Sequence, residues 1–299
     1  MKKVLVIAGL TASGKTSLSL NWAHKLKGEI INADSQQVYQ GLDIGTAKVS
    51  SLEQQQVPHH LLDILKVEEH FNVKRFQELC RQKIDEISHR GHLPILVGGT
   101  GLYLKAALYD YVFDEETAQD PFENIRTEDL VRKLKDIDPK SLESIHPNNR
   151  KRIIRALNMA KTSLKSDRIE AQNHQALYDV YWLVLSPPKS VIDQRIQERV
   201  DKMFKAGLLE EVTHFFKEDK THSYQSFQAI GYKEFKDYFN QEASLDEVKE
   251  KIVVRTRQFA KKQMTWFRHQ LPSKFVNSLD AEEMQKAYED VINWLEVKT

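Results

Sequence analysis

A segment near the amino end of the chain has the composition of a loop that binds phosphate. Residues 9–16, GLTASGKT, match the pattern G-x-x-x-x-G-K-[ST], between a strand-like run and a helical pattern as the motif requires. Backbone N–H groups and the helix amino end attract an anion, Lys15 adds a point charge, and the Thr16 hydroxyl can hold Mg²⁺. The alternative is a glycine turn that matches by chance. We expect a polyphosphate to be held by Gly9, Thr11, Ala12, Ser13, Gly14, Lys15 and Thr16.

This loop predicts a polyphosphate ligand but does not identify the reaction. NTPases usually carry an acidic residue at the end of an apolar strand, where it helps to hold Mg²⁺. The best candidate strand here, LPILV, is followed by GGTG at residues 98–101 and by no acid. The small residues indicate either close approach of a ligand or a tight turn that needs glycine for its own backbone. ATP hydrolysis is therefore disfavoured.

A carboxylate follows the second strand-like run, EIINA. Asp34 begins the segment DSQQVY, and the carboxyl end of this strand lies next to the phosphate loop in a doubly wound sheet. Asp34 could hold Mg²⁺ through water or act as a general base. Its alternative role is the N-cap of the segment that follows.

A pair of arginines follows the fifth strand-like run at helical spacing. Arg195 and Arg199, in VIDQRIQERVDKMF, could reach a departing phosphate group. The alternative is surface ion pairing with Asp193 or Glu198.

Basic residues gather in two further segments, although the net charge of the chain is only +1. HPNNRKRIIR, residues 146–155, contains four cations, and residues 251–279 contain basic residues but no acid. In the second segment Arg257, Lys261 and Arg268 share a helix face, whereas Ile252, Phe259 and Trp266 recur every seven residues as an apolar stripe. We interpret the stripe as core packing and the cations as a footprint for a phosphate backbone, with a solvated face as the alternative.

The elements that position these residues alternate between strand and helix. Strand-like runs occur at residues 3–8, 29–33, 61–65, 93–97 and 180–185. This order predicts an α/β fold with a doubly wound parallel sheet. Residues 113–177 show no convincing strand and predict a helical insertion, which leaves residues 1–112 and 178–299 as the core. After residue 188 we expect helices at 189–206, 207–218, roughly 227–240, 244–270 and 280–297.

Composition narrows the class of protein. The 299 residues suffice for a large core, no apolar run is long enough to cross a membrane, and the apolar start leads into the glycine loop and not into a cleavage site. The single cysteine, Cys80, excludes disulfides within the chain and cysteine-built zinc sites. We expect a cytoplasmic protein, monomeric and without membrane contact.

Seven segments, in their order along the chain, resemble those of bacterial tRNA dimethylallyltransferases, and the resemblance covers nearly the whole chain. They are GLTASGKTSL, INADSQQVYQGLDIGTAK, VPHHLLDI, PILVGGTGLYLKA, HPNNRKRIIRAL, AIGYKEF and RQFAKKQMTWFR. The resemblance implies transfer of a dimethylallyl group from its pyrophosphate to the exocyclic N6 amine of the adenine just 3′ of the tRNA anticodon, position 37. It also implies a core like that of P-loop kinases, an insertion that grips the anticodon arm, and Mg²⁺.

The resemblance also assigns roles to residues of this sequence. Asp34 matches the general base, and Thr100 matches a threonine near the reacting centre. With this reaction, Lys15, the loop amides and Mg²⁺ on Thr16 would stabilise the leaving pyrophosphate, which Arg195 and Arg199 could also reach. Ser35, Gln36 and Gln37 match a segment that contacts tRNA. The remaining expected tRNA contacts are Lys151, Arg152, Arg155, Gln228, Lys233, Arg257, Lys261, Lys262 and Arg268.

Three positions depart from the family pattern. Leu10 stands where proline is common, and Gln228 and Lys233 stand where other members carry arginine. Lysine keeps the charge but loses the bidentate fork, so these two tRNA contacts are in doubt.

Two other functions share the phosphate loop. A kinase of a nucleoside or small metabolite would leave the basic segments unexplained. A non-catalytic RNA-binding ATPase would leave Asp34 and the GGTG turn unexplained.

Overall fold

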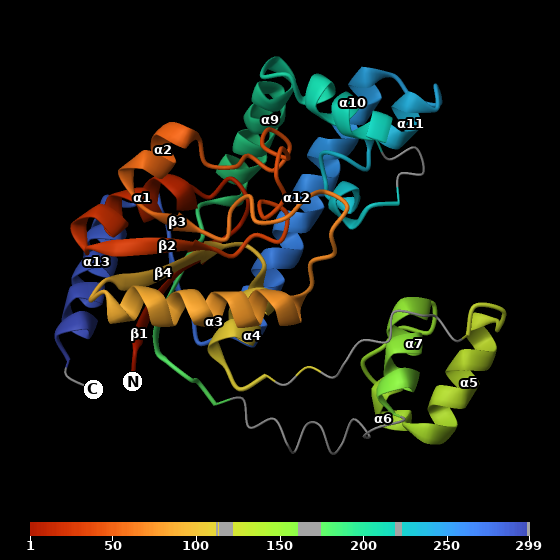
Figure 1. The fold of residues 1–299 in the computed structure, drawn as a ribbon, viewed down its shortest axis with the longest axis horizontal. Helices are drawn as coiled ribbons and strands as arrows, with labels where there is room; N and C mark the ends of the chain where they lie inside the picture. Colours follow the sequence, from red (N-terminus) through yellow and green to blue (C-terminus); the bar gives the residue numbers. More distant parts are fainter. Residues whose placement is uncertain (112, 114–121, 161–174, 219–222, 298–299) are drawn as a thin grey trace. The chain divides into compact units, whose positions relative to one another are not determined.

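The chain forms two compact units in the computed structural model, which describes residues 1–111, 113, 122–160, 175–218 and 223–297. The first unit comprises Met1–Leu108 with Leu177–Thr299, and the second comprises Tyr109–Ala176. Figure 1 shows the first unit as a sheet with helices on both sides and the second as a group of helices.

The first unit is built on one sheet of six strands in the order β3-β2-β4-β1-β5-β6, and all neighbouring strands are parallel. The strands are β1 (Lys3–Gly9), β2 (Gly28–Asn32), β3 (His59–His60), β4 (Leu93–Gly98), β5 (Asp179–Leu185) and β6 (Lys274–Val276). The central strands are almost entirely buried because helices cover both faces. The predicted α/β class with a parallel sheet is confirmed.

Helices α1 (Lys15–Lys25) and α13 (Ala281–Glu296) cover one face of the sheet, where Trp22 and Val291 pack in one cluster with Ile7, Ile30 and Leu183. Figure 1 shows α3 (Val73–His89) running along the other side of the sheet, next to α4 (Gly101–Leu108). The long helix α12 (Leu245–Gln270) contacts β1, α4 and α9 (Lys189–Lys205). The remaining helices of this unit are α2 (Ser51–Gln56), α10 (Leu208–Glu218), η1 (Gln225–Gln228) and α11 (Phe235–Phe239).

The strand expected at residues 61–65 is wrong. The strand that pairs with β2 is His59–His60, in register with Ile30 and Ile31. Leu61 and Asp63 have φ angles of +61° and +52°, which end the extended conformation. Leu61 and Leu65 are buried because this loop folds back on residue 38, whose carbonyl accepts hydrogen bonds from the N–H groups of residues 64 and 65.

The carboxyl-terminal part of the first unit differs from the prediction at two places. Strand β6 was not expected, because three residues between two helices are too short to show a period. The helix expected at 227–240 is two short pieces, η1 and α11. Between them Gly231 has a φ of +100°, and its N–H donates to the Glu234 carboxylate instead of continuing a helix.

The second unit is helical in the part that the structure describes, with α5 (Thr127–Ile137), α6 (Pro139–Leu142) and α7 (Arg150–Met159). Leu130 and Leu134 of α5 pack against Ile153 and Leu157 of α7. The guanidinium of Arg150 donates to the backbone carbonyls of residues 122 and 125, so this cation holds the unit together.

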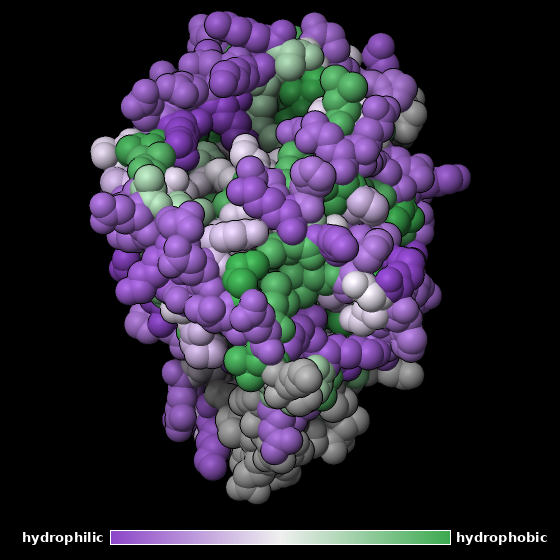
Figure 2. All heavy atoms as spheres, turned by 90° about the vertical axis from the view of Figure 1, so that its left-hand side faces the viewer, coloured by the Kyte–Doolittle hydropathy of each residue, from purple (hydrophilic) through white to green (hydrophobic). Residues whose placement is uncertain are grey.

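Figure 2 shows one face of the molecule, and the composition of this face is that of a surface in contact with water. Hydrophilic side chains predominate there, and hydrophobic ones form separate patches among them. Among the described residues, no helix combines the length and the apolarity that crossing a membrane requires.

Candidate active site at the carboxyl ends of the strands

A cavity of about 840 Å³ lies beyond the carboxyl ends of β1, β2 and β4. This is where parallel sheets bind their ligands, and the volume is typical of a small-molecule site. Five parts of the chain form the wall: the phosphate loop, the segment after β2, the segment after β4, helix α9 and helix α12. The lining residues include Thr11, Ala12, Ser13, Gly14, Lys15, Thr16, Asp34, Gln37, Gly98, Gly99, Arg195, Arg199 and Gln263.

The phosphate loop turns through two residues in the left-handed region. Ala12 has a φ of +62°, and Gly14, which is the N-cap of α1, has a φ of +93°. The left-handed conformation costs alanine roughly 1–2 kcal/mol, which is a local strain typical of functional loops. The first turn of α1 contains no acidic side chain to neutralise the positive helix end. The loop therefore has the shape and potential that an anion requires.

The charge of Lys15 is held in an unfavourable environment. Its Nζ donates to the carbonyls of Gly9 (3.1 Å) and Leu10 (2.6 Å), inside the loop itself. Burial, followed by the nearby charge of Arg199, lowers the pKa of Lys15 from 10.5 to about 7, and the charge of Asp34 opposes both effects. A strongly shifted pKa in a cavity is typical of a functional site. A bound anion would supply the negative charge that these cations lack.

Both arginines of α9 face the cavity. Nη1 of Arg195 lies 3.5 Å from the carbonyl oxygen of Ala12, and Nη2 of Arg199 donates to the carbonyl of Thr46 at 3.1 Å. Burial lowers the pKa of Arg199, and Asp34 opposes this. The alternative of pairing with Asp193 or Glu198 is not observed among the described residues.

Those two carboxylates have other partners. Asp193 pairs with Lys189, and Glu198 accepts a hydrogen bond from Gln194.

The side chain of Asp34 makes a local hydrogen bond to the segment that follows it and also lines the cavity. Its Oδ1 accepts a hydrogen bond from the backbone N–H of Gln36 at 2.8 Å, which forms an Asx turn and not a helix N-cap, because residues 35–38 are not helical. The side chain of Asn32 holds the Asp34 backbone on both sides, accepting from its N–H and donating to its carbonyl, each at 3.2 Å. Among the described residues Oδ2 accepts no hydrogen bond. The carboxylate therefore stays oriented at the cavity with one oxygen able to take a proton.

The glycines of the GGTG turn are required by neighbouring parts of the protein. A Cβ atom on Gly98 would lie 2.4 Å from the carbonyl oxygen of Ala33, and one on Gly99 would lie 2.1 Å from Nε2 of Gln263. Close packing within the protein is therefore a reason for glycine at both positions, in addition to the two that the sequence suggested. Thr100 precedes α4, and its carbonyl accepts hydrogen bonds from the first turn of that helix. It is not among the residues that line the cavity.

Sequence reasoning missed Gln263 of α12. Its Oε1 accepts from the N–H of Thr11 (3.0 Å), and its Nε2 donates to the carbonyl of Gly99 (3.0 Å). One buried amide thus joins the phosphate loop to the turn after β4. The sequence offered one sign of this role, which is a single glutamine among the apolar residues on the buried side of the helix. It was overlooked because the expected stripe placed the buried side elsewhere.

The expected stripe of Ile252, Phe259 and Trp266 is wrong at Phe259, whereas Ile252 is buried and Trp266 is half-buried against Gly101. Phe259 is 40% exposed and lines the cavity. A period of seven drifts by about 20° per heptad on a straight helix, so such a stripe rotates off the core face. The buried residues of α12 are Val248, Ile252, Val253, Ala260, Gln263 and Phe267.

The predicted tRNA contacts occupy several elements. On α12 the side chains of Arg257, Lys261, Lys262 and Arg268 are exposed, and Arg257 also approaches Asp193 of α9 at 3.8 Å. On α7 of the second unit Lys151, Arg152 and Arg155 are exposed. After β2, Gln37 lines the cavity and Ser35 and Gln36 are half-buried beside it. Gln228 is exposed at the end of η1, and Lys233 is half-buried; neither lines the cavity.

The cavity offers donors that suit a magnesium ion. Thr16 and Asp34 line the same cavity, and a hydroxyl and a carboxylate are the hard oxygen ligands that Mg²⁺ takes, usually together with water and phosphate oxygens. The described residues contain no group of three or more histidine, cysteine or acidic side chains that would form an all-protein metal cage. The donor set fits a metal that arrives with its phosphate ligand.

Comparison with known proteins identifies relatives of the whole chain. A sequence profile described as IPP transferase matches residues 37–270. A tRNA dimethylallyltransferase of Geobacillus thermodenitrificans is 43% identical over 304 residues, covering 98% of this chain and 96% of the relative. One from Bacillus cereus is 42% identical over 308 residues, covering 100% and 97%.

Solved structures agree with this relationship. A tRNA isopentenylpyrophosphate transferase from Staphylococcus epidermidis is 37% identical, with a TM-score of 0.74 and coverage of 98% of this chain and 99% of that one. A eukaryotic dimethylallyltransferase acting on tRNA is 30% identical, with a TM-score of 0.87 and coverage of 98% and 80%. The similarity therefore extends through the fold and across the cavity.

Proposed function

The chain belongs to the IPP transferase family, and we propose that it transfers the dimethylallyl group of dimethylallyl pyrophosphate to the N6 amine of adenine 37 in tRNA. The products are N6-isopentenyladenosine in the tRNA and pyrophosphate. The observation that carries this proposal is the pairing of an anion-binding loop with a carboxylate, Asp34, in the wall of one cavity. The family match selects prenyl transfer to tRNA from the reactions that such a site could perform.

The cationic side of the cavity suits a pyrophosphate leaving group. As the allylic C–O bond breaks, its electron pair moves onto the pyrophosphate oxygen. Backbone N–H groups of the loop, Lys15, Arg195 and Arg199 surround the place where this charge grows, and they stabilise it without reorganising. No water needs activation in this reaction, which accounts for the missing acid at the end of β4. Thr100 stays a candidate near the reacting centre, beside Gly99.

The carboxylate side of the cavity suits the acceptor amine. The lone pair of an adenine amine is delocalised into the ring, so the amine is a poor nucleophile unless its proton is removed as the new C–N bond forms. Asp34 takes that proton on Oδ2, while its Oδ1 stays bonded to the Gln36 N–H. A stacked base cannot reach a buried pyrophosphate, so the adenine enters the cavity flipped out of the anticodon loop.

The tRNA backbone is proposed to follow the exposed cations of the two units. Lys151, Arg152 and Arg155 of α7 contact the anticodon arm, and Lys261, Lys262 and Arg268 of α12 add phosphate contacts near the cavity. Ser35, Gln36 and Gln37 meet the nucleotides next to the flipped adenine. Mg²⁺ held by the Thr16 hydroxyl would add charge that stabilises the leaving pyrophosphate. A monomer in the cytoplasm, where tRNA is modified, is the form that we propose.

The reaction is tested with purified protein, Mg²⁺ and unmodified tRNA, supplied with either dimethylallyl pyrophosphate or ATP. Mass spectrometry of the digested nucleosides should show a prenylated adenosine only with the allylic donor. ADP formation that depends on a small-molecule acceptor, with no prenylated nucleoside, would instead identify a kinase and refute the proposal.

The footprint on α12 is tested by the salt dependence of tRNA binding. Lys261→Ala combined with Arg268→Ala removes two proposed phosphate contacts, so the slope of log affinity against log salt should fall by about 1.5. The matched control is Lys25→Ala with Lys286→Ala, on helices α1 and α13 that cover the sheet face of the Trp22 cluster. An unchanged slope in the first variant would mean that this helix face contacts solvent and not the phosphates of tRNA.

A further inference from the structure

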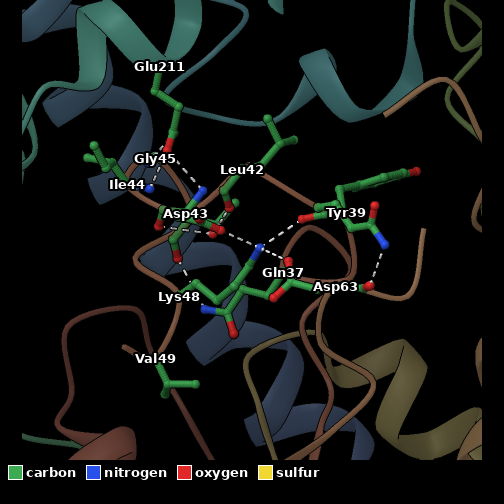
Figure 3. A network of polar contacts seen from close by, with 12 residues as sticks. Gln37, Tyr39, Leu42, Asp43, Ile44, Gly45, Lys48, Val49, Asp63 and Glu211 are labelled. Atoms are coloured by element: carbon green, nitrogen blue, oxygen red, sulfur yellow. Dashed lines mark hydrogen bonds and ion pairs between the residues drawn. The ribbon is translucent and has the colours of Figure 1, made fainter. Parts of the chain in front are cut away.

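The loop from residue 41 to residue 48, GLDIGTAK, is held by one carboxylate from a distant helix. Glu211 of α10 accepts hydrogen bonds from three consecutive backbone N–H groups, those of Asp43 (3.0 Å), Ile44 (2.8 Å) and Gly45 (3.0 Å). Figure 3 shows the Glu211 carboxylate pointing at this turn of the loop. Three N–H groups that converge on one anion form a nest, and here the protein supplies the anion itself.

A fourth donor completes the environment of Glu211. The Tyr232 hydroxyl donates to Oε1 of Glu211 at 2.6 Å. Burial, followed by the negative charge of Glu211, raises the pKa of Tyr232, so that its hydroxyl keeps its proton and remains a donor. A Cβ atom on Gly45 would lie 2.5 Å from the Tyr232 ring, so only glycine lets the loop backbone reach this position. The contact between Glu211 and the loop therefore depends on Tyr232 as well as on the glycine at position 45.

The other side of the same loop belongs to the cavity. Asp43, Ile44, Thr46 and Lys48 all line it. The Thr46 carbonyl, one residue beyond the three captured N–H groups, accepts hydrogen bonds from Arg199 Nη2 (3.1 Å) and from Gln37 Nε2 (3.2 Å).

Lys48 ties the end of the loop down. Its side chain is 3% exposed, and its Nζ donates to the Tyr39 carbonyl (2.7 Å), to Asp43 (2.6 Å) and to Asp63 (Figure 3). The loop is thus rigid where it meets Arg199.

We propose that Glu211 is a positioning residue for the leaving group: by fixing the backbone of residues 43–45 it places the Thr46 carbonyl, which orients the Arg199 guanidinium toward the pyrophosphate. This rests on the proposed function, because it assumes that the cavity binds pyrophosphate. Arg199 needs such an orienting acceptor, since a nearby cation, Lys15, would otherwise repel it from the loop. Glu211 itself is not among the residues that line the cavity, so its effect passes through the loop.

The test is the substitution Glu211→Gln, which keeps the shape but replaces one acceptor oxygen by an NH₂ group that faces backbone N–H donors. The measurements are calorimetric binding of inorganic pyrophosphate with Mg²⁺, KM and kcat with dimethylallyl pyrophosphate, and tRNA affinity. We expect pyrophosphate binding to weaken about tenfold and KM to rise with it, with tRNA affinity within about twofold of wild type. Glu210→Gln, an exposed neighbour with the same change of charge, should match wild type.

A double-mutant cycle separates positioning from general loss of structure. If Glu211 acts through Arg199, then Glu211→Gln should weaken pyrophosphate binding by less than about twofold in an Arg199→Ala background. Full additivity of the two losses, or wild-type binding by Glu211→Gln, would overturn the proposal. Should Glu211→Gln unfold, Tyr232→Phe perturbs the same carboxylate more mildly, and its smaller loss should also vanish in the Arg199→Ala background. Failure of the wild-type protein to bind pyrophosphate would instead refute the proposed function, and this inference with it.

Discussion

Strand β2 begins at a buried carboxylate with a complete set of partners and ends beside cations that face a cavity. At the start, Oε1 of Glu29 lies 2.7 Å from His92 Nδ1 and 3.1 Å from Arg90 Nε, and Oε2 lies 2.7 Å from both His60 Nε2 and Arg90 Nη2. Burial by itself would raise the pKa of Glu29, but the hydrogen bonds of Arg90, His60 and His92 outweigh it and lower the pKa to about 2.

At the other end of β2 the balance of charge is reversed. Burial and the nearby charge of Arg199 lower the pKa of Lys15 to about 7, and the charge of Asp34 opposes both effects without balancing them. Both ends bury charge, so burial does not distinguish them. The difference is that the Glu29 end is satisfied by the protein, whereas the Asp34 end leaves an electrostatic deficit for a ligand to fill. An unbalanced charge group in a cavity therefore indicates function, and a balanced one indicates stability.

The largest effect that would sharpen this comparison is expected at Asp34. Asp34→Asn keeps the size and the oxygen that accepts from the Gln36 N–H but loses the proton acceptor, so prenyl transfer should fall about 10²- to 10⁴-fold. Single-turnover rates check this, and tRNA affinity and Tm should change little. Near-normal turnover would show that Asp34 is not the base, and the contrast between a functional and a stabilising end of β2 would then no longer hold.

At the opposite end of β2, Glu29→Gln should affect folding and leave the reaction nearly unchanged. Loss of the charged hydrogen bonds should reduce the free energy of unfolding by about 2 kcal/mol at pH 7, measured by urea denaturation. The folded pKa of about 2 lies below the ordinary 4.5, so the stabilisation is present above pH 4.5 and disappears as the pH falls toward 2.

The difference between wild type and Glu29→Gln should shrink over that same range of pH. Glu78→Gln, an exposed change on α3, serves as the control. A loss of turnover with unchanged stability in Glu29→Gln would contradict the division between the two ends.

A smaller loss is expected from Gln263, which supports the functional end from α12. Gln263→Leu removes the hydrogen bonds to Thr11 and Gly99, and kcat/KM for dimethylallyl pyrophosphate should fall about tenfold through a less ordered phosphate loop. Gln258→Leu on the exposed side of the same helix should keep the wild-type value. Equal kcat/KM values for the two variants would mean that the reaction does not need the hydrogen bonds by which Gln263 connects the phosphate loop to the turn after β4.

The smallest effect is a fraction of one proton at Lys15. With a pKa of about 7 in the free protein, Lys15 is about half protonated at pH 7, and a bound anion favours its charged form. Pyrophosphate binding should therefore take up about half a proton at pH 7 and more at pH 8, measured by calorimetry in buffers of different ionisation enthalpy. Lys15→Arg, which stays charged, should lack this contribution while pyrophosphate itself titrates equally in both proteins. Identical proton uptake would show that Lys15 is charged without its ligand.

Local signals predicted the parts of the site that are continuous in sequence. The phosphate loop, the strand before it and the helix after it follow from glycine spacing and alternating apolar residues, and the parallel sheet follows from their order. The short strands β3 and β6 did not follow, because two or three residues show no period and exist only through pairing with β2 and β5. The stripe on α12 failed because the 7-residue spacing ignored the drift of a straight helix.

The sequence by itself determined the chemistry available to this protein: a loop for phosphate, a carboxylate after the second strand, cations on two helices, and a family. Tertiary structure decided how those groups act. The pKa of Lys15 depends on Arg199, which is 184 positions away along the chain, and the loop at residues 43–45 depends on Glu211. Electrostatic interactions and hydrogen bonds depend on distance in space and on burial, so no local pattern can specify them.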